Sequence, residues 1–120
     1  VSVAMEAAYA LSEQGIEVGV VDPVVAHPLD AATLCAEISR YAAVVTIEEH
    51  VLSGGFGAAV SAALHDWGLD HVKLIHLGVA DTFVPHGPRD GLLAECGLDV
   101  ASVVGVCVRL TTGAGYPTIR

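Results

Sequence analysis

Three short runs rich in β-branched residues recur at nearly constant spacing along this chain. They begin near residues 16, 43 and 71, so that one strand-like run and one helix-like segment repeat about every 27 or 28 residues. Connections of that length are typical of parallel strands, because the chain crosses back through a helix before the next strand begins. The apolar runs are nearly continuous rather than alternating, as expected of strands that are covered on both faces. The pattern predicts an α/β fold with a mostly parallel sheet in a three-layer α/β/α arrangement.

The helical segments have recognisable ends. Gly15 stands where a left-handed C-terminal cap of the first helix belongs, and Asp30 can cap the second helix through its carboxylate. Tyr41 and Trp67 are expected on the inward, apolar faces of the second and third helices. In chain order, we predict a helix over 2–14, a strand over 16–22, a helix from 30 to 41, a strand over 43–47, a helix over 56–67, a strand over 71–77 and helices over 88–97 and 99–110.

One domain accounts for most of the chain. The length of 120 residues fits a single domain of ordinary size. Periodic segments run through residues 1–110, whereas residues 111–120 have no period and are predicted to form a flexible tail. A strand is expected before the opening helix, and we interpret its absence as the mark of an N-terminally incomplete domain from a longer protein.

The charge pattern argues against nucleic acid and anionic membranes as partners. Fourteen acidic residues against five scattered basic ones give a formal net charge of −9, which repels phosphate groups. No run approaches the roughly 20 uninterrupted apolar residues of a membrane-spanning helix, and the 53% hydrophobic content excludes disorder. These features predict a soluble globular protein and leave a basic protein or a neutral small molecule open as partners.

Neither the cysteines nor the histidines form a recognisable metal or redox motif. Cys35, Cys96 and Cys107 make no CxxC pair and lie in apolar stretches, which indicates reduced thiols in a cytoplasmic protein. None of the six histidines has HxxxH or HExxH spacing, and His71 and His76 would lie on opposite faces of one strand. We expect ordinary histidines and no metal site in this chain.

The most distinctive local motif lies where the second strand gives way to the third helix, over residues 48–57. Its glycines match neither GxGxxG nor a Walker sequence, and Ser53 is not in a GxSxG elbow. We favour a structural interpretation, in which the glycines permit a tight turn and a close helix approach while the carboxylates face solvent or accept backbone amides. Acid and base catalysis by Glu48 with His50 is the alternative.

Four short motifs along the chain form a pattern shared with a known family. They are Val21-Asp-Pro23, His27-Pro-Leu-Asp30, Val45-Thr-Ile-Glu-Glu-His50 with Gly54-Gly-Phe-Gly57, and Asp81-Thr-Phe83 with His86-Gly87. In this order they resemble the C-terminal domain of transketolase-like thiamine diphosphate enzymes, over residues 1 to about 105. The segment from Phe83 to Asp99 is most similar to the 1-deoxy-D-xylulose-5-phosphate synthases.

The resemblance implies a domain that supports the homodimer of a larger transferase. That enzyme uses thiamine diphosphate and Mg²⁺ to decarboxylate pyruvate and condense the two-carbon unit with glyceraldehyde 3-phosphate, releasing CO2 and giving a precursor of isoprenoids and thiamine. In this family the cofactor motifs lie in the N-terminal and middle domains, so we expect no catalytic, cofactor-binding or metal residue here and an inactive isolated chain. The matching residues are then a structural or interface motif, made of Glu48, Glu49, His50, Gly54, Gly55, Gly57 and His86.

Two other functions stay open. The C-terminal domain of transketolase, or of a 2-oxoacid dehydrogenase β subunit, shares the Glu-Glu and Gly-Gly elements, and in the latter the domain docks a partner protein, for which an acidic surface is suited. A freestanding small α/β enzyme that uses Glu48 and His50 is the third hypothesis.

Overall fold

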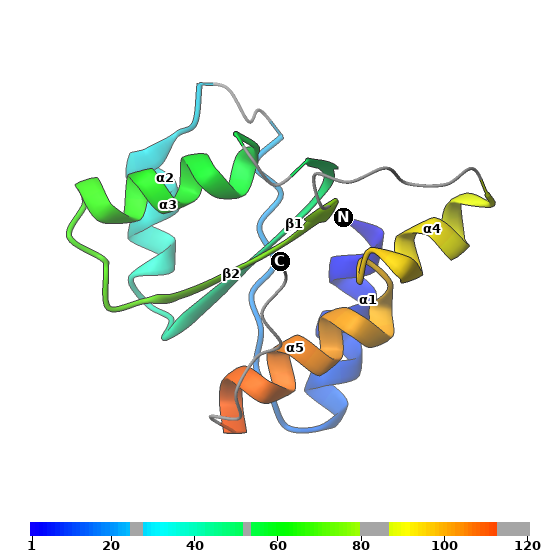
Figure 1. Ribbon diagram of the computed structural model, residues 1–120. Coiled ribbons are helices and arrows are strands. Elements are labelled where there is room, and N and C mark those ends of the chain that lie inside the picture. Colours follow the sequence, from blue (N-terminus) through cyan, green and yellow to red (C-terminus); the bar gives the residue numbers. More distant parts are fainter. Residues whose placement is uncertain (25–27, 52–53, 80–86, 113–120) are drawn as a thin grey trace. The chain divides into compact units, whose positions relative to one another are not determined.

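The computed structural model describes residues 1–24, 28–51, 54–79 and 87–112. These residues belong to two compact units, one formed by Val1–Asp22 with Thr82–Arg120 and the other by Pro23–Asp81. We call them the terminal unit and the central unit. The described elements, in chain order, are α1 (Ser2–Glu13), α2 (Ala31–Ile38), β1 (Ala43–Val51), α3 (Phe56–Asp66), β2 (Lys73–Val79), α4 (Arg89–Glu95) and α5 (Val100–Thr112) (Figure 1).

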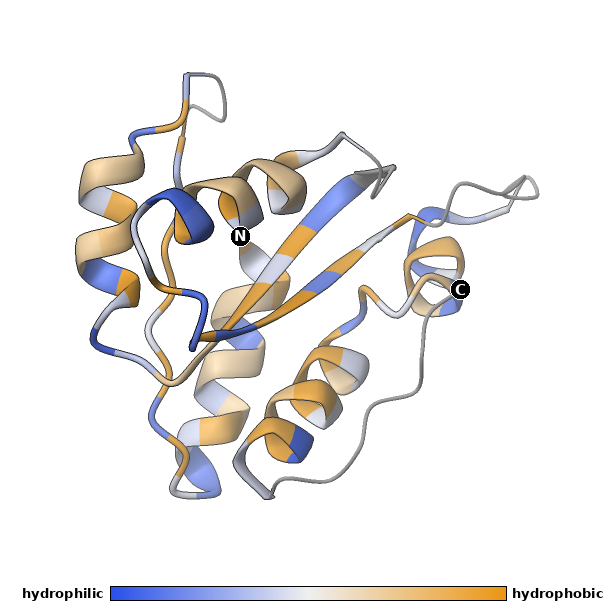
Figure 2. Cartoon of the chain, turned by 60° about the vertical axis from the view of Figure 1, so that its left-hand side comes forward, coloured by the Kyte–Doolittle hydropathy of each residue, from blue (hydrophilic) through white to orange (hydrophobic). Residues whose placement is uncertain are grey.

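The central unit is built on a two-stranded parallel sheet of β1 and β2. The two strands pair from Ala43 with Lys73 to Ile47 with Leu77, and the register shifts before Val51 pairs with Val79. Helix α3 connects the strands and packs against β1, so the strand, helix, parallel strand order predicted from the spacing is confirmed. Figure 2 shows mostly apolar residues along β1 and a hydrophilic stretch towards its carboxyl end.

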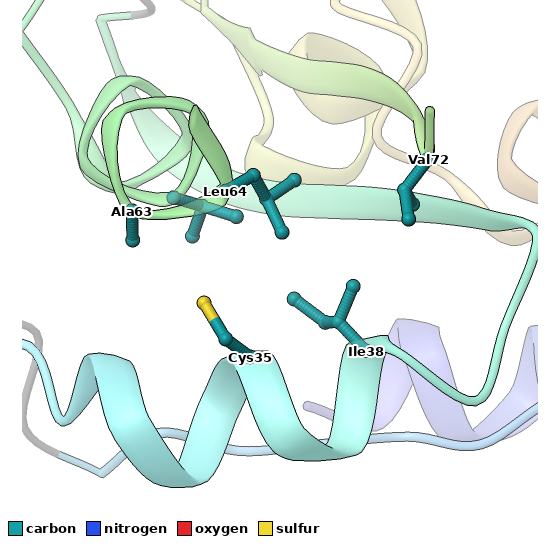
Figure 3. Packing of buried hydrophobic residues seen from close by; sticks show 6 residues of the cluster. Cys35, Ile38, Ala63, Leu64 and Val72 are labelled. Carbon is teal, nitrogen blue, oxygen red and sulfur yellow. The ribbon is translucent and has the colours of Figure 1, made fainter. Parts of the chain in front are cut away.

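The core of the central unit lies between α2, α3 and the residues that lead into β2. Cys35 and Ile38 of α2 face Ala63 and Leu64 of α3, with Val72 beside them (Figure 3). All of these side chains are buried, and so is Val60. Burial of this apolar surface is the main force that holds the two helices together.

The predicted cap of α2 is confirmed. Asp30 accepts a hydrogen bond of 3.2 Å from the backbone amide of Thr33. Hydrogen bonds from the side chain and the backbone of Thr33 lower the pKa of the Asp30 carboxyl. A charged carboxylate here satisfies one of the free amides of the first helical turn.

The terminal unit consists of α1, α4 and α5, and α1 packs along α5. Ala7 and Leu11 of α1 are buried, as are Leu98 and Val103. The first helix ends as predicted, because Gly15 has a φ of +77° and Ile16 donates its amide hydrogen to the carbonyl of Leu11, which is the Schellman pattern.

The strand predicted over residues 16–22 is wrong for this structure, in which that segment has no regular secondary structure. A strand exists only as part of a hydrogen-bonded ladder. Within the described ranges, the only ladder joins β1 to β2. Val18 and Val21, which were expected inside a sheet, are accordingly exposed.

Several predicted boundaries and burials also need correction. Helix α2 ends at Ile38, which leaves Tyr41 outside it and 37% exposed, and Trp67 follows the last residue of α3 and is 53% exposed. Strand β1 continues to Val51 and so includes the acidic pair, which the predicted strand over 43–47 left out, whereas β2 begins after His71. Helix α4 is shorter than predicted and α5 runs two residues past 110. The remainder of the predicted tail, residues 113–120, lies outside the described residues.

One described stretch, Arg89–Thr112, is long and apolar enough to cross a membrane by length and composition alone. A single stretch of this kind is weak support for a membrane span, because core helices of soluble proteins pass the same test. Here it comprises two helices, since the chain turns at Gly97 with a φ of +72°. The 7 residues of α4 and the 13 of α5 are each shorter than the roughly 20 that a bilayer requires.

Candidate functional site at the β1 to α3 junction

Glu48 links the end of β1 to the beginning of α3. Its Oε2 accepts a hydrogen bond of 2.6 Å from the backbone amide of Phe56 and a longer one of 3.3 Å from Gly57. The residue at the N-cap position, Gly55, has no side chain that could cap the helix. A carboxylate from the preceding strand therefore fills the role of an N-cap side chain, at the end of the helix where negative charge is favoured.

The glycines before α3 turn the chain from the strand into the helix. Gly54 has a φ of +70°, in the left-handed region that other residues adopt at a cost. Gly55 is buried and extended, with φ −81° and ψ −170°. A tight turn at these positions is the geometry expected for them from the sequence.

Gly57, in the first turn of α3, lies close against side chains of both strands. A Cβ atom built on it would lie 2.3 Å from Nδ1 of His76 and 2.8 Å from Oγ1 of Thr46. Thr46 and His76 are paired in the register of β1 and β2, and their Oγ1 and Nδ1 atoms are 2.9 Å apart. The imidazole and the hydroxyl thus occupy the space that any larger residue at position 57 would need.

The other motif residues are only partly placed. Glu49 lies in β1 with an exposed side chain. The backbone of His50 continues the same strand, but its side chain lies outside the description, and so do His86 and the rest of the 80–86 segment. Of the Glu48 and His50 pair proposed for acid and base catalysis, the structure therefore describes only the Glu48 side chain. Its carboxylate accepts hydrogen bonds from the backbone amides of Phe56 and Gly57.

No group of three or more His, Cys, Asp or Glu side chains that could hold a metal ion occurs among the described residues. Cys35, Cys96 and Cys107 are free thiols. Burial raises the pKa of the Cys35 and Cys107 thiols. Since the thiolate is the reactive form, these two cysteines are poor nucleophiles.

Sequence reasoning missed the Thr46 and His76 pair. His76 was treated as one of several ordinary histidines, because it belongs to no ligand motif. The signal that could have found it is the parallel register, which places two residues 30 positions apart side by side under the one glycine inside the third helix.

The chain can now be compared with known proteins. The family model described as the C-terminal domain of transketolase matches residues 1–103. The chain belongs to the transketolase C-terminal domain family. This confirms the resemblance inferred from the four motifs, together with the α/β fold class.

Relatives of this transketolase C-terminal domain carry a consistent name. A protein of Geobacter sulfurreducens named 1-deoxy-D-xylulose-5-phosphate synthase 1 is 36% identical over 114 residues, which cover 95% of this chain and 18% of the relative. The 1-deoxy-D-xylulose-5-phosphate synthase of Syntrophotalea carbinolica is 42% identical over 100 residues, or 83% of this chain and 16% of the relative. The chain thus spans less than a fifth of the length of these relatives, and it is similar to the branch of the family that the sequence indicated.

A solved structure shows the same fold. The protein titled split gene transketolase, inactive beta4 tetramer, superposes with a TM-score of 0.81 at 35% sequence identity. The match covers 92% of this chain and 36% of that one. This chain is therefore similar in fold to part of that transketolase.

Proposed function

We propose that this chain is the C-terminal domain of a 1-deoxy-D-xylulose-5-phosphate synthase. The observation that carries the proposal is the 36 to 42% identity to enzymes of that name over 83 to 95% of the chain. The whole enzyme would join pyruvate to glyceraldehyde 3-phosphate with release of CO2, using thiamine diphosphate and Mg²⁺. Its product would feed the synthesis of isoprenoids and of thiamine.

Within that enzyme, the role of this domain is structural. The amides of Phe56 and Gly57, at the glycine-rich helix N-terminus, already bind the carboxylate of Glu48. A diphosphate group brought to the same amides would meet a negative charge. The residues described here therefore do not fit thiamine diphosphate, and we assign the cofactor and Mg²⁺ to other domains of the longer protein.

The remaining proposals follow from the same assignment. The domain would contact the N-terminal and middle domains of its own polypeptide, support a homodimer and work in the cytoplasm. Glu48, Glu49, His50, Gly54, Gly55, Gly57 and His86 would serve as a structural or interface motif rather than as catalytic residues.

The direct test uses the longer polypeptide that carries this chain. We expect it to form 1-deoxy-D-xylulose 5-phosphate from pyruvate and glyceraldehyde 3-phosphate when both cofactors are present. Two-carbon transfer from ketose phosphates without use of pyruvate would instead indicate a transketolase, and co-purification with an acyltransferase would indicate a docking subunit.

The isolated 120-residue chain provides a second test. We expect calorimetric titration to show no Mg²⁺-dependent binding of thiamine diphosphate and no consumption of pyruvate. Micromolar, Mg²⁺-dependent binding to this chain would overturn the structural role while leaving the family unchanged.

A further inference from the structure

Thr46, Gly57 and His76 meet where α3 lies against the sheet. Thr46 is 4% exposed, and its hydroxyl reaches the imidazole of its register partner His76 across the strand pair. The space beside Gly57 is filled by these two side chains, since a Cβ there would lie below 3.0 Å from both. The contact of α3 with the sheet at this point is thus a size-matched one, between a glycine and the side chains of His76 and Thr46.

The same glycine also takes part in the cap of the helix. Its amide donates to Oε2 of Glu48 at 3.3 Å, next to the shorter bond from Phe56. Gly57 therefore both packs against the sheet and donates a hydrogen bond to the capping carboxylate of Glu48. Because hydrogen bonds weaken steeply with length and angle, a small shift of α3 relative to the sheet changes both.

We propose that His76 is a positioning residue for the N-terminus of α3. Its ring, hydrogen bonded to Thr46, fixes the distance between Gly57 and the sheet. The amides of Phe56 and Gly57 are thereby kept within hydrogen-bond distance of the Glu48 carboxylate. The proposal extends the Glu48 cap to a residue on β2 that belongs to none of the sequence motifs. It rests on contacts within the central unit and is independent of the function proposed for the whole enzyme.

Amide hydrogen exchange in the longer polypeptide that carries this chain tests this role. His76→Ala removes the ring, His76→Asn keeps a polar group that can bond to Thr46, and His71→Ala is the matched control at an exposed histidine outside the strands. We expect the Phe56 and Gly57 amides to exchange at least tenfold faster in His76→Ala, and to keep rates close to those of the unmodified protein in the other two variants.

The amide of Thr33 is the internal reference, since it binds the Asp30 carboxylate at the start of another helix of the same unit. Unchanged exchange at Phe56 and Gly57 in His76→Ala would overturn the proposal. An equal acceleration at Thr33 would also overturn it, because that result shows general loss of stability instead of a local effect on the α3 cap.

The size match is tested separately with Gly57→Ala. We expect this change to lower the melting temperature in the unmodified protein and to lower it by less than half as much in the His76→Ala background. The ring, which gives the shortest contact, is then gone, and only the Thr46 hydroxyl still lies near the added methyl group. Gly91→Ala is the control, since its Cβ meets nothing within 4 Å. Equal losses in the two backgrounds would show that Gly57 and His76 are not coupled.

Discussion

The carboxylate of Glu48, in β1, accepts a hydrogen bond 2.6 Å long from the backbone amide of Phe56, the first residue of α3. This bond lets glycines occupy the turn between strand and helix without leaving the first helical amides unpaired, because the capping group comes from eight residues earlier. A glycine-rich motif that matches no phosphate-binding fingerprint in the sequence is, in this fold, part of a capped helix start.

Replacement of Glu48 by Ala should destabilise the protein by about 1 to 2 kcal/mol, since the α3 amides lose their acceptor and the helix end loses a favourable charge. Urea denaturation of the longer polypeptide that carries this chain measures this loss. Glu6→Ala, at an exposed position of α1, is the control and should change stability by less than about 0.5 kcal/mol. Equal effects of the two changes would mean that the hydrogen bonds of Glu48 contribute nothing.

Replacement of Gly54 by Ala should cost about 1 to 2 kcal/mol, because its φ of +70° lies in the left-handed region. A Cβ at Gly54 meets no atom within 4 Å, so the loss reports backbone strain alone. Gly105→Ala in α5 also meets open space and should leave stability unchanged or raise it slightly. Thermal unfolding midpoints measure both effects. Equal midpoints for the Gly54→Ala and Gly105→Ala variants would contradict the strain assigned to Gly54.

The parallel connection of β1 and β2, the cap at Asp30 and the turn at Gly15 could all be predicted, because each depends on residues close in sequence. Whether residues 16–22 form a strand could not be predicted from residues close in sequence. Their β-branched composition favours a strand, but a strand requires a partner, and the described residues supply none. The burial of Trp67 was wrong for a related reason, because α3 ends at Asp66 and the helical periodicity no longer applies.

The candidate site was predictable in part. The sequence indicated that the glycines serve backbone geometry and that the carboxylates accept amides or face solvent, and the structure places Glu48 on two amides and Glu49 at the surface. The sequence alone could not show that His76 lies beside Gly57. That contact depends on the register of two strands and on the depth at which α3 packs, and neither is encoded in a local pattern.

His65 and Asp70 give a prediction for pH. Their Nδ1 and Oδ1 atoms are 2.9 Å apart, and the hydrogen bond to Asp70, helped by its negative charge, raises the pKa of His65 above 6.5. The pair therefore contributes stability that is fully present below about pH 6.5 and is lost as pH rises through the raised pKa of the folded state.

Titration of the His65 ring signals by NMR measures that pKa directly. Asp70→Asn should lower it, and Asp66→Asn should lower it by less, because the charge of Asp66 is a smaller contribution. An unchanged His65 pKa in Asp70→Asn would contradict the pairing.

The two-stranded sheet gives a prediction about the longer protein. Open strand edges recruit other chains. We predict that a strand from a segment preceding Val1 in the longer polypeptide completes the sheet and allows residues 16–22 to pair. A protein extended upstream by about 20 residues, enough for one strand and its connection, should be monodisperse and melt in one transition, whereas the 120-residue chain should associate. Light scattering and urea denaturation that find the two proteins equally soluble and equally cooperative would refute the added strand.

The most direct test of the structural role of this domain is to transplant it into a related enzyme in place of that enzyme's own C-terminal domain. Residues 1–103, which match the family model, would replace the corresponding part of the 1-deoxy-D-xylulose-5-phosphate synthase 1 of Geobacter sulfurreducens, whose identity to this chain is 36%. We predict that the chimera keeps its Michaelis constant for thiamine diphosphate and retains kcat within about tenfold, a change of about 1.4 kcal/mol in the barrier. A folded, dimeric chimera that no longer binds the cofactor or no longer condenses pyruvate with glyceraldehyde 3-phosphate would contradict the account.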